Sequence, residues 1–188
     1  MKTLLHICCG ICAVSVGERL ISEGHDVTGF FYNPNIHPSE EYERRLQVAQ
    51  DVANWLKIRL IVPAYEPEGW LEQTREFTRE PEGGKRCAVC FRIRLQAAFD
   101  HLLNSNFDAF TTTLTVSPHK SAAVVNQIGT EIGGDKFLVR DFKKKDGFKR
   151  SNEIAKQLGL YHQHYCGCVY SLKASLMRTN GPHGGQND

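Results

Sequence analysis

Short apolar runs alternate with helical patterns along this chain, and the alternation restricts the possible fold more than any other feature. Runs rich in β-branched and aromatic residues lie at 3–7, 27–32, 59–63, 109–114 and 137–140. Helical patterns are expected at about 15–22, 39–56, 85–103, 119–132 and 151–158. Alternation of this kind is typical of a parallel sheet with helices on both faces. We therefore predict one α/β domain over residues 1–177 with a mostly parallel five-stranded sheet, followed by a disordered polar tail at 178–188.

Unusual residues follow several of these runs. The first run leads into "CCGIC" (8–12), the second into "YNPNIHP" (32–38), the fourth into "TVSPHK" (115–120) and the fifth into "RDF" (140–142). Ligands of open parallel sheets bind beyond the carboxyl ends of the strands. We therefore expect a metal site at the carboxyl ends of the strands.

Seven cysteines form three groups: Cys8, Cys9 and Cys12; Cys87 and Cys90; Cys166 and Cys168. Four thiolates are enough for a structural zinc ion, so seven exceed what one zinc needs. Thiolates also bind iron–sulfur clusters. The "YCGC" pair is too closely spaced for an unstrained disulfide, which fits an easily reduced redox couple. A second pair of metal ligands is an almost equally good interpretation of that pair.

The first cysteine group stands where a nucleotide-binding protein would carry its glycine-rich phosphate loop. Such a loop binds phosphate through backbone amides at a helix N-terminus. Here the same position is lined with soft metal ligands instead. This disfavours a mechanism driven by ATP.

The net charge is only +2, so any affinity for nucleic acid has to come from a local patch. The stretch "KFLVRDFKKKDGFKR" (136–150) is the densest basic segment and includes Lys143, Lys144 and Lys145. Its lysines could contact phosphates, with Phe142 and Phe148 as base-stacking groups. A solvated loop is the alternative.

No apolar run approaches the roughly 20 residues of a membrane-spanning helix, and the N-terminus does not resemble a secretory signal. We therefore expect a cytoplasmic protein with no membrane partner. In that reducing compartment, cysteines are metal ligands or redox groups more often than disulfides.

Seven blocks of the sequence resemble the signature blocks of QueH-type epoxyqueuosine reductases. They lie between about 3 and 171 and read "HICCGIC", "GFFYNPNIHP", "EYERR", "GGKRCAVCFRIRL", "FTTTLTVSPHK", "RDF…GFKRS" and "LGLYHQHYCGCVYS". One departure is that Gly10 and Ile11 stand where the family pattern has Ala-Pro. The resemblance implies removal of the epoxide oxygen from epoxyqueuosine in the tRNA anticodon loop, without cobalamin. It also implies a [4Fe–4S] cluster, with a second mononuclear iron in some members.

The resemblance assigns roles to particular cysteines. Cys8, Cys9, Cys87 and Cys90 match the cluster ligands, Cys166 and Cys168 match a redox-active pair, and Cys12 is left for the second metal. Asp141 is a candidate ligand of that metal or a proton donor, with a salt bridge to neighbouring basic residues as the alternative. Conversion of an epoxide into an alkene and water consumes two electrons and two protons, so an electron donor is an implied partner beside the tRNA.

Further polar residues are candidates for substrate contact: Tyr32, Asn33, Asn35, His37 and Lys120. For the four in the 32–38 loop, simple turn chemistry is an equal alternative. His6 is expected to be a packed core histidine. Two other functions stay open from the residues alone: a cluster-dependent enzyme of RNA sulfur chemistry, and a zinc-stabilised RNA-binding module without catalysis.

Overall fold

The sheet is parallel throughout and has four strands. The computed structural model describes residues 1–179, and of Arg178 and Thr179 only the backbone. The strands are β1 (Lys2–His6), β2 (Asp26–Phe30), β3 (Arg59–Ile61) and β4 (Ala109–Thr112), in the order β3-β2-β1-β4. Leu4 and Leu5 of the central strand β1 are fully buried. Burial on both faces explains why this strand reads as a continuous apolar run.

The predicted fifth strand at 137–140 is wrong. Only one residue pair, Phe110 with Phe137, forms a parallel bridge there. The Leu138 N–H donates to the Phe110 carbonyl at 2.9 Å, but the Leu138 carbonyl accepts from the Thr111 hydroxyl at 3.0 Å. A side-chain bond therefore stands where the next bond of a backbone ladder would continue the strand. Val139 beyond it is half exposed.

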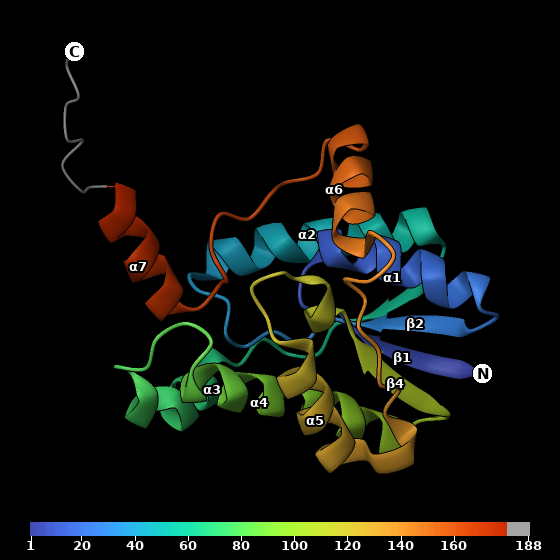
Figure 1. Ribbon diagram of the computed structural model, residues 1–188, viewed down its shortest axis with the longest axis horizontal. Coiled ribbons are helices and arrows are strands. Elements are labelled where there is room, and N and C mark those ends of the chain that lie inside the picture. The colour runs from blue at the N-terminus through green and yellow to red at the C-terminus, as the bar shows by residue number, and fades with distance from the viewer. Residues whose placement is uncertain (180–188) are drawn as a thin grey trace.

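Helices cover both faces of the sheet, as predicted (Figure 1). One layer holds α1 (Gly10–Ser22), α2 (Ser39–Leu56) and α6 (Gly147–Gln157); the opposite layer holds α4 (Lys85–Leu103) and α5 (Ala122–Gly133). Two helices lie outside the predicted set, α3 (Pro67–Thr74) and α7 (Val169–Thr179). Short 3₁₀ segments are η1 (Arg75–Phe77), η2 (Thr113–Val116) and η3 (Gly134–Lys136).

Several predicted boundaries need correction. Helix α1 begins five residues before the predicted position, directly after the first cysteines. Ser39, the predicted cap of α2, is its first helical residue, and Pro38 holds the cap position. The run at 109–114 ends as a strand at Thr112 because the Thr112 hydroxyl accepts from the Leu114 N–H at 3.1 Å and starts η2. The predicted tail begins inside α7, and its remainder lies outside the described residues.

Gly10 allows the first cysteine loop to lie against α2. A Cβ atom at this position would come within 2.6 Å of the Val48 carbonyl carbon. Real Cβ contacts are not that short, so a larger residue would push α1 away from α2. Gly10 therefore fits the close approach of these two helices.

The described residues contain no helix that is long and apolar enough to cross a membrane.

Candidate metal centre

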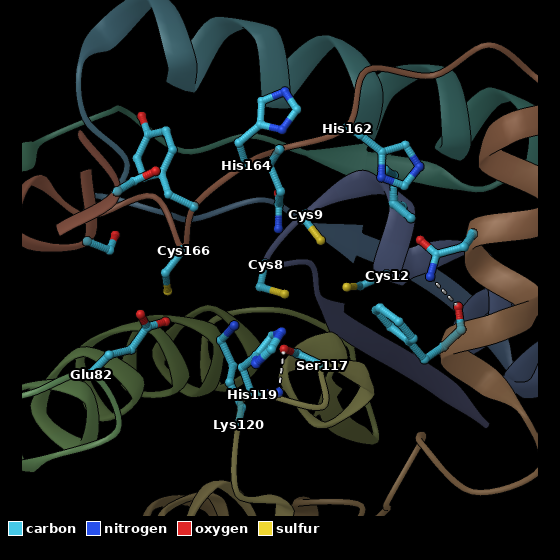
Figure 2. A pocket seen from close by; sticks show the side chains of 17 residues that line it. Cys8, Cys9, Cys12, Glu82, Ser117, His119, Lys120, His162, His164 and Cys166 are labelled. Carbon is cyan, nitrogen blue, oxygen red and sulfur yellow. Dashed lines mark hydrogen bonds between the residues drawn. The ribbon is translucent and has the colours of Figure 1, made fainter. Parts of the chain in front are cut away.

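The first cysteine group lies at the junction of β1 and α1. Cys9 is the N-cap residue of α1, and Cys12 lies in its first turn. The sulfur atoms of Cys8, Cys9 and Cys12 all lie within 4.8 Å of one another, and all three residues are buried. Figure 2 shows the three thiols converging at the edge of one cavity. Three soft ligands at this separation can hold a metal ion.

Hydrogen bonds make Cys8 the most acidic thiol of this group. Those from the thiols of Cys12 and Cys9 lower its pKa well below the usual value, and the Thr113 hydroxyl acts in the same direction. Thr113 donates to Cys8 Sγ at 3.1 Å and accepts from the Cys8 N–H at 2.9 Å. The pKa of Cys12 is raised well above its usual value, first by its bond to Cys8. Within this group, the hydrogen bonds therefore favour a negative charge on Cys8 over one on Cys12.

The second and third cysteine groups interact with each other. Cys87 and Cys90 lie in the first two turns of α4, where the Gly83 N–H donates to Cys87 Sγ at 3.2 Å. Burial raises the pKa of Cys90 to about 11, and electrostatic interaction with Cys166 and Cys168 acts in the same direction. Interaction with Cys166 and Cys168 also raises the pKa of Cys87, after the larger effect of burial. The thiols of Cys87 and Cys90 on α4 and those of Cys166 and Cys168 before α7 thus form a second set of cysteines that interact electrostatically.

Two cations, Arg94 and Lys120, interact electrostatically with both sets of cysteines. Arg94 is buried, which by itself would lower its pKa, but its electrostatic interactions with Cys90 and Cys8 raise that pKa overall. Burial likewise opposes the charge of the half-buried Lys120, whereas Cys166, Cys8 and Cys12 raise its pKa. Each cation therefore interacts with at least one cysteine of the first group and one of the second set. Such cations favour thiolates over thiols at this centre.

A cavity of about 620 Å³ opens over the first cysteine group. Predicted site residues in its wall are Cys8, Cys9, Cys12, Cys166 and Lys120. A second cavity of about 210 Å³ is lined by Cys87 and shares Cys166 and Lys120 with the first. Cys166 and Lys120 therefore stand between the two cavities, whereas Cys90 and Cys168 are not among the described residues that line either.

Sequence reasoning missed several polar residues of the larger cavity: Glu82, Ser117, His119, Asn152, His162, Gln163, His164 and Tyr165. Figure 2 shows His162 and His164 on the side opposite His119 and Lys120. The signal that could have found the two histidines is "YHQHYC", which places alternating histidines directly before a cysteine.

The polar loop at 32–38 does not line either of the two cavities in the described structure. Asn33 is buried; its amide donates to the Ile7 carbonyl at 2.8 Å, and its oxygen accepts from Arg94 at 3.4 Å. His37 Nδ1 bonds the Asn35 carbonyl at 2.9 Å. The Tyr32 carbonyl bonds Nε2 of His6 at 3.3 Å. These contacts fit the turn-chemistry alternative, and the role of this loop in substrate contact stays a prediction.

His6 is the packed core histidine that the sequence predicts. It is fully buried, and Nδ1 lies 2.8 Å from the Thr112 hydroxyl. Burial, reinforced by Arg94, lowers its pKa to about 3. The ring is therefore neutral at physiological pH.

Asp141 and Lys143 face each other. Asp141 Oδ1 accepts from the Lys143 N–H at 3.2 Å and lies 3.7 Å from Lys143 Nζ. Lys143 Nζ also donates to the carbonyls of Thr115 and Lys120, at 3.2 and 3.1 Å. Lys143 therefore supports the loop that carries Lys120. The contacts of Asp141 are those of the salt-bridge alternative, and its role toward a metal stays a prediction.

The rest of the basic segment divides into buried and exposed parts. Phe142 is 1% exposed and packs under the Arg19 guanidinium, so it is a core residue and not a stacking group. Phe148 is 43% exposed and lines the larger cavity. Lys144 and Lys145 are exposed. Within this segment, Phe148 is therefore the accessible aromatic ring at the cavity, and Lys144 and Lys145 are accessible on the protein surface.

Comparison with known proteins identifies the family. The model of the family described as "Epoxyqueuosine reductase QueH" matches residues 3–174. Relatives carrying that name include proteins of Streptococcus pyogenes (37% identity; 90% of this chain and 70% of the relative), Thermotoga maritima (33%; 90% and 89%) and Dehalococcoides mccartyi (31%; 96% and 98%).

A likeness of fold extends to a solved structure described as a predicted subunit of tRNA methyltransferase from Methanocaldococcus jannaschii. It covers 87% of this chain and 93% of that one, with a TM-score of 0.57 and 11% identity. This similarity concerns the fold alone. The family match and the curated relatives, by contrast, extend over nearly the whole sequence, and the chain therefore belongs to the QueH family of epoxyqueuosine reductases.

Proposed function

We propose that this chain reduces epoxyqueuosine to queuosine in the anticodon loop of tRNA, in the 620 Å³ cavity over the first cysteine group. The observation that carries the proposal is that Cys8, Cys9, Cys12, Cys166 and Lys120 line one cavity, and that Cys166 and Lys120 also line the neighbouring cavity of Cys87. Family membership supports the same reaction and makes the chain an oxidoreductase.

The proposed cofactor is a [4Fe–4S] cluster held by Cys8, Cys9, Cys87 and Cys90, with Cys12 left for a second iron. The donor set fits this group, because cysteine thiolates are its usual protein ligands and all four cysteines are free; three of them are buried and Cys87 is half-buried. Arg94 interacts electrostatically with three of these ligands, Cys90, Cys8 and Cys87, and also with Cys166, so it can offset negative charge of thiolates at this centre. When bound, such a cluster supplies electrons one at a time.

The proposed role of Cys166 and Cys168 is to complete the electron count. Their two thiols carry two electrons and two protons, and closure of a disulfide releases both. Opening the epoxide to an alkene and water consumes the same number. Cys166 is placed for this role because it lines both cavities. An external reductant, the proposed partner, then returns the disulfide to two thiols.

The proposed substrate contacts are two residues that line the cavity and three exposed lysines of the basic segment. Phe148 offers a ring on which a base can stack, and a stacked base gains about 1–3 kcal/mol. The exposed Lys144, Lys145 and Lys149 can contact phosphates of the anticodon stem-loop. Lys120, inside the cavity, faces the reacting group and not the RNA backbone. Because tRNA is the substrate, the cytoplasm is the proposed compartment.

Anaerobic purification followed by iron and sulfide quantification tests the cofactor. Sulfide near four per chain, with iron at about four, or about five when the second iron is bound, and a broad absorption band near about 400 nm support a [4Fe–4S] cluster. A colourless protein with zinc contradicts it and favours the RNA-binding module. Turnover of epoxyqueuosine in tRNA separates the reductase from an enzyme of RNA sulfur chemistry.

A further inference from the structure

A buried ion pair on α2 lies directly behind the turn that carries Cys166 and Cys168. Arg45 Nε donates to Glu41 Oε1 at 2.7 Å, and these residues are 2% and 1% exposed. Tyr161 donates to the other Glu41 oxygen at 2.9 Å. Both charges are thus compensated away from water. Buried pairs of this kind contribute little net stability compared with apolar residues, so their use has to be sought in what they hold.

Arg45 directs its two remaining nitrogens to the backbone of the cysteine pair. Nη1 donates to the Cys166 carbonyl at 3.0 Å, and Nη2 donates to the Tyr165 carbonyl at 3.1 Å. The guanidinium also lies over the Tyr165 ring, 5.0 Å from its centre. A planar fork of this kind fixes the direction of two consecutive carbonyls, which a lysine cannot do.

The contact between Arg45 and the cysteine turn requires glycine at position 167. Its φ of +121° is a conformation that other residues rarely adopt. A Cβ atom there would meet Arg45 Nη1 at 2.8 Å. On the other side, the Gly167 carbonyl accepts from the His37 N–H at 2.8 Å. The turn between the two cysteines is therefore clamped between α2 and the 32–38 loop.

We propose that Arg45 is a positioning residue that holds the Cys166–Gly167–Cys168 turn so that the Cys166 thiol points into the cavity. Figure 2 shows this thiol at the cavity wall, facing the space between Cys8 and Glu82. Fixing the carbonyls of Tyr165 and Cys166 fixes the peptide planes on both sides of the Cys166 Cα atom, which restricts the directions open to its side chain. This inference rests on the proposed function for its turnover assay but not for its thiol assay.

The test compares Arg45→Lys with Arg44→Lys in the cluster-containing enzyme. Arg45→Lys keeps the buried positive charge beside Glu41 but removes the paired hydrogen bonds to the carbonyls of Tyr165 and Cys166. Arg44 is the matched control, because it also pairs with Glu41, at 3.3 Å, from the same helix, but lies over the Tyr161 ring instead of the cysteine turn. Gly167→Ala displaces the turn without changing a charge. Iron content, thermal unfolding, kcat, KM and the alkylation rates of Cys166 and Cys168, resolved by mass spectrometry, are measured for all.

We expect Arg45→Lys and Gly167→Ala to keep their iron and to alkylate faster at Cys166. Their kcat should fall on the order of 100-fold, as small misplacements of reacting groups do, with little change in KM. Arg44→Lys should match the wild type. A lower unfolding temperature with wild-type kcat and alkylation would overturn the proposal and leave Arg45 a merely structural residue.

If Arg45→Lys does not fold, Gly167→Ala alone decides, by the same readouts. A wild-type enzyme without turnover contradicts the proposed function; faster alkylation of Cys166 in the variants then still supports the positioning role.

Discussion

Thr113→Val removes a hydroxyl that makes two hydrogen bonds with Cys8. This buried hydroxyl accepts from the Cys8 N–H at 2.9 Å and donates to Cys8 Sγ at 3.1 Å. Valine has nearly the same shape, so the substitution leaves no large cavity but leaves the buried N–H without a partner. Such a loss costs about 1–3 kcal/mol of unfolding free energy. For a chain of this size, each kcal/mol lowers Tm by roughly 2–4 °C.

The same substitution should raise the pKa of Cys8, because it removes one of the donors that lower it. Urea unfolding measures the first effect, and the pH dependence of Cys8 alkylation in metal-free protein measures the second. Thr113→Ser is the matched control, since it keeps the hydroxyl and loses one methyl group, about 0.8 kcal/mol. If the valine and serine variants unfold alike and Cys8 alkylates with the same pH dependence in both, the reasoning about this hydroxyl is refuted.

Three further predictions concern the core and the RNA face. His6→Gln should lessen the acid sensitivity of folding, because the pKa of His6 is about 3 in the folded state and about 6.5 in the unfolded state. The stability that the neutral ring contributes is therefore complete above pH 6.5 and is lost as the pH falls toward 3, at up to about 1.4 kcal/mol per pH unit. Alanine at Lys144, Lys145 and Lys149 should weaken tRNA binding and flatten its logarithmic salt slope by roughly 0.7–0.9 for each phosphate that the variant no longer neutralises. Phe148→Ala should raise KM for the tRNA and leave the iron content unchanged, whereas Phe148→Tyr should retain binding.

Each of these has a result that contradicts it. Parallel pH–stability curves for wild type and His6→Gln would mean that this ring is not kept neutral by folding. For the lysines, Lys2→Ala at the amino end of β1 is the control on the opposite edge of the sheet; an equally large weakening of tRNA binding in it would remove the special role of the basic segment. Unchanged KM in Phe148→Ala would place the base elsewhere in the cavity.

The sequence is most informative where one local pattern determines the structure. The predictions of the β1 run and of the helix at 85–103 are confirmed, because buried apolar runs and helical periodicity are local signals. Cys8, Cys9 and Cys12 lie together as expected, since they follow one strand and begin one helix. The packed state of His6 also follows from its place inside a strand.

The failures share a different cause, which is a contact between distant segments. The bond from the Thr111 hydroxyl ends the expected strand at 137–140, and no pattern within 137–140 encodes that bond. Phe142 and Phe148 are alike in sequence context, yet one packs under Arg19 and the other borders the cavity. Arg45 looks like an ordinary basic residue of an amphipathic helix until the turn at 165–168 is placed beside it.

The most direct test of the central claim is a nucleoside analysis of tRNA. Epoxyqueuosine-containing tRNA is incubated anaerobically with the iron-containing protein and a low-potential reductant, digested, and separated by liquid chromatography with mass detection. We predict that epoxyqueuosine is converted to queuosine, with loss of one oxygen atom, and that Cys166→Ala retains its iron but not this conversion. Unchanged epoxyqueuosine with iron-replete, reduced wild-type protein would contradict the account.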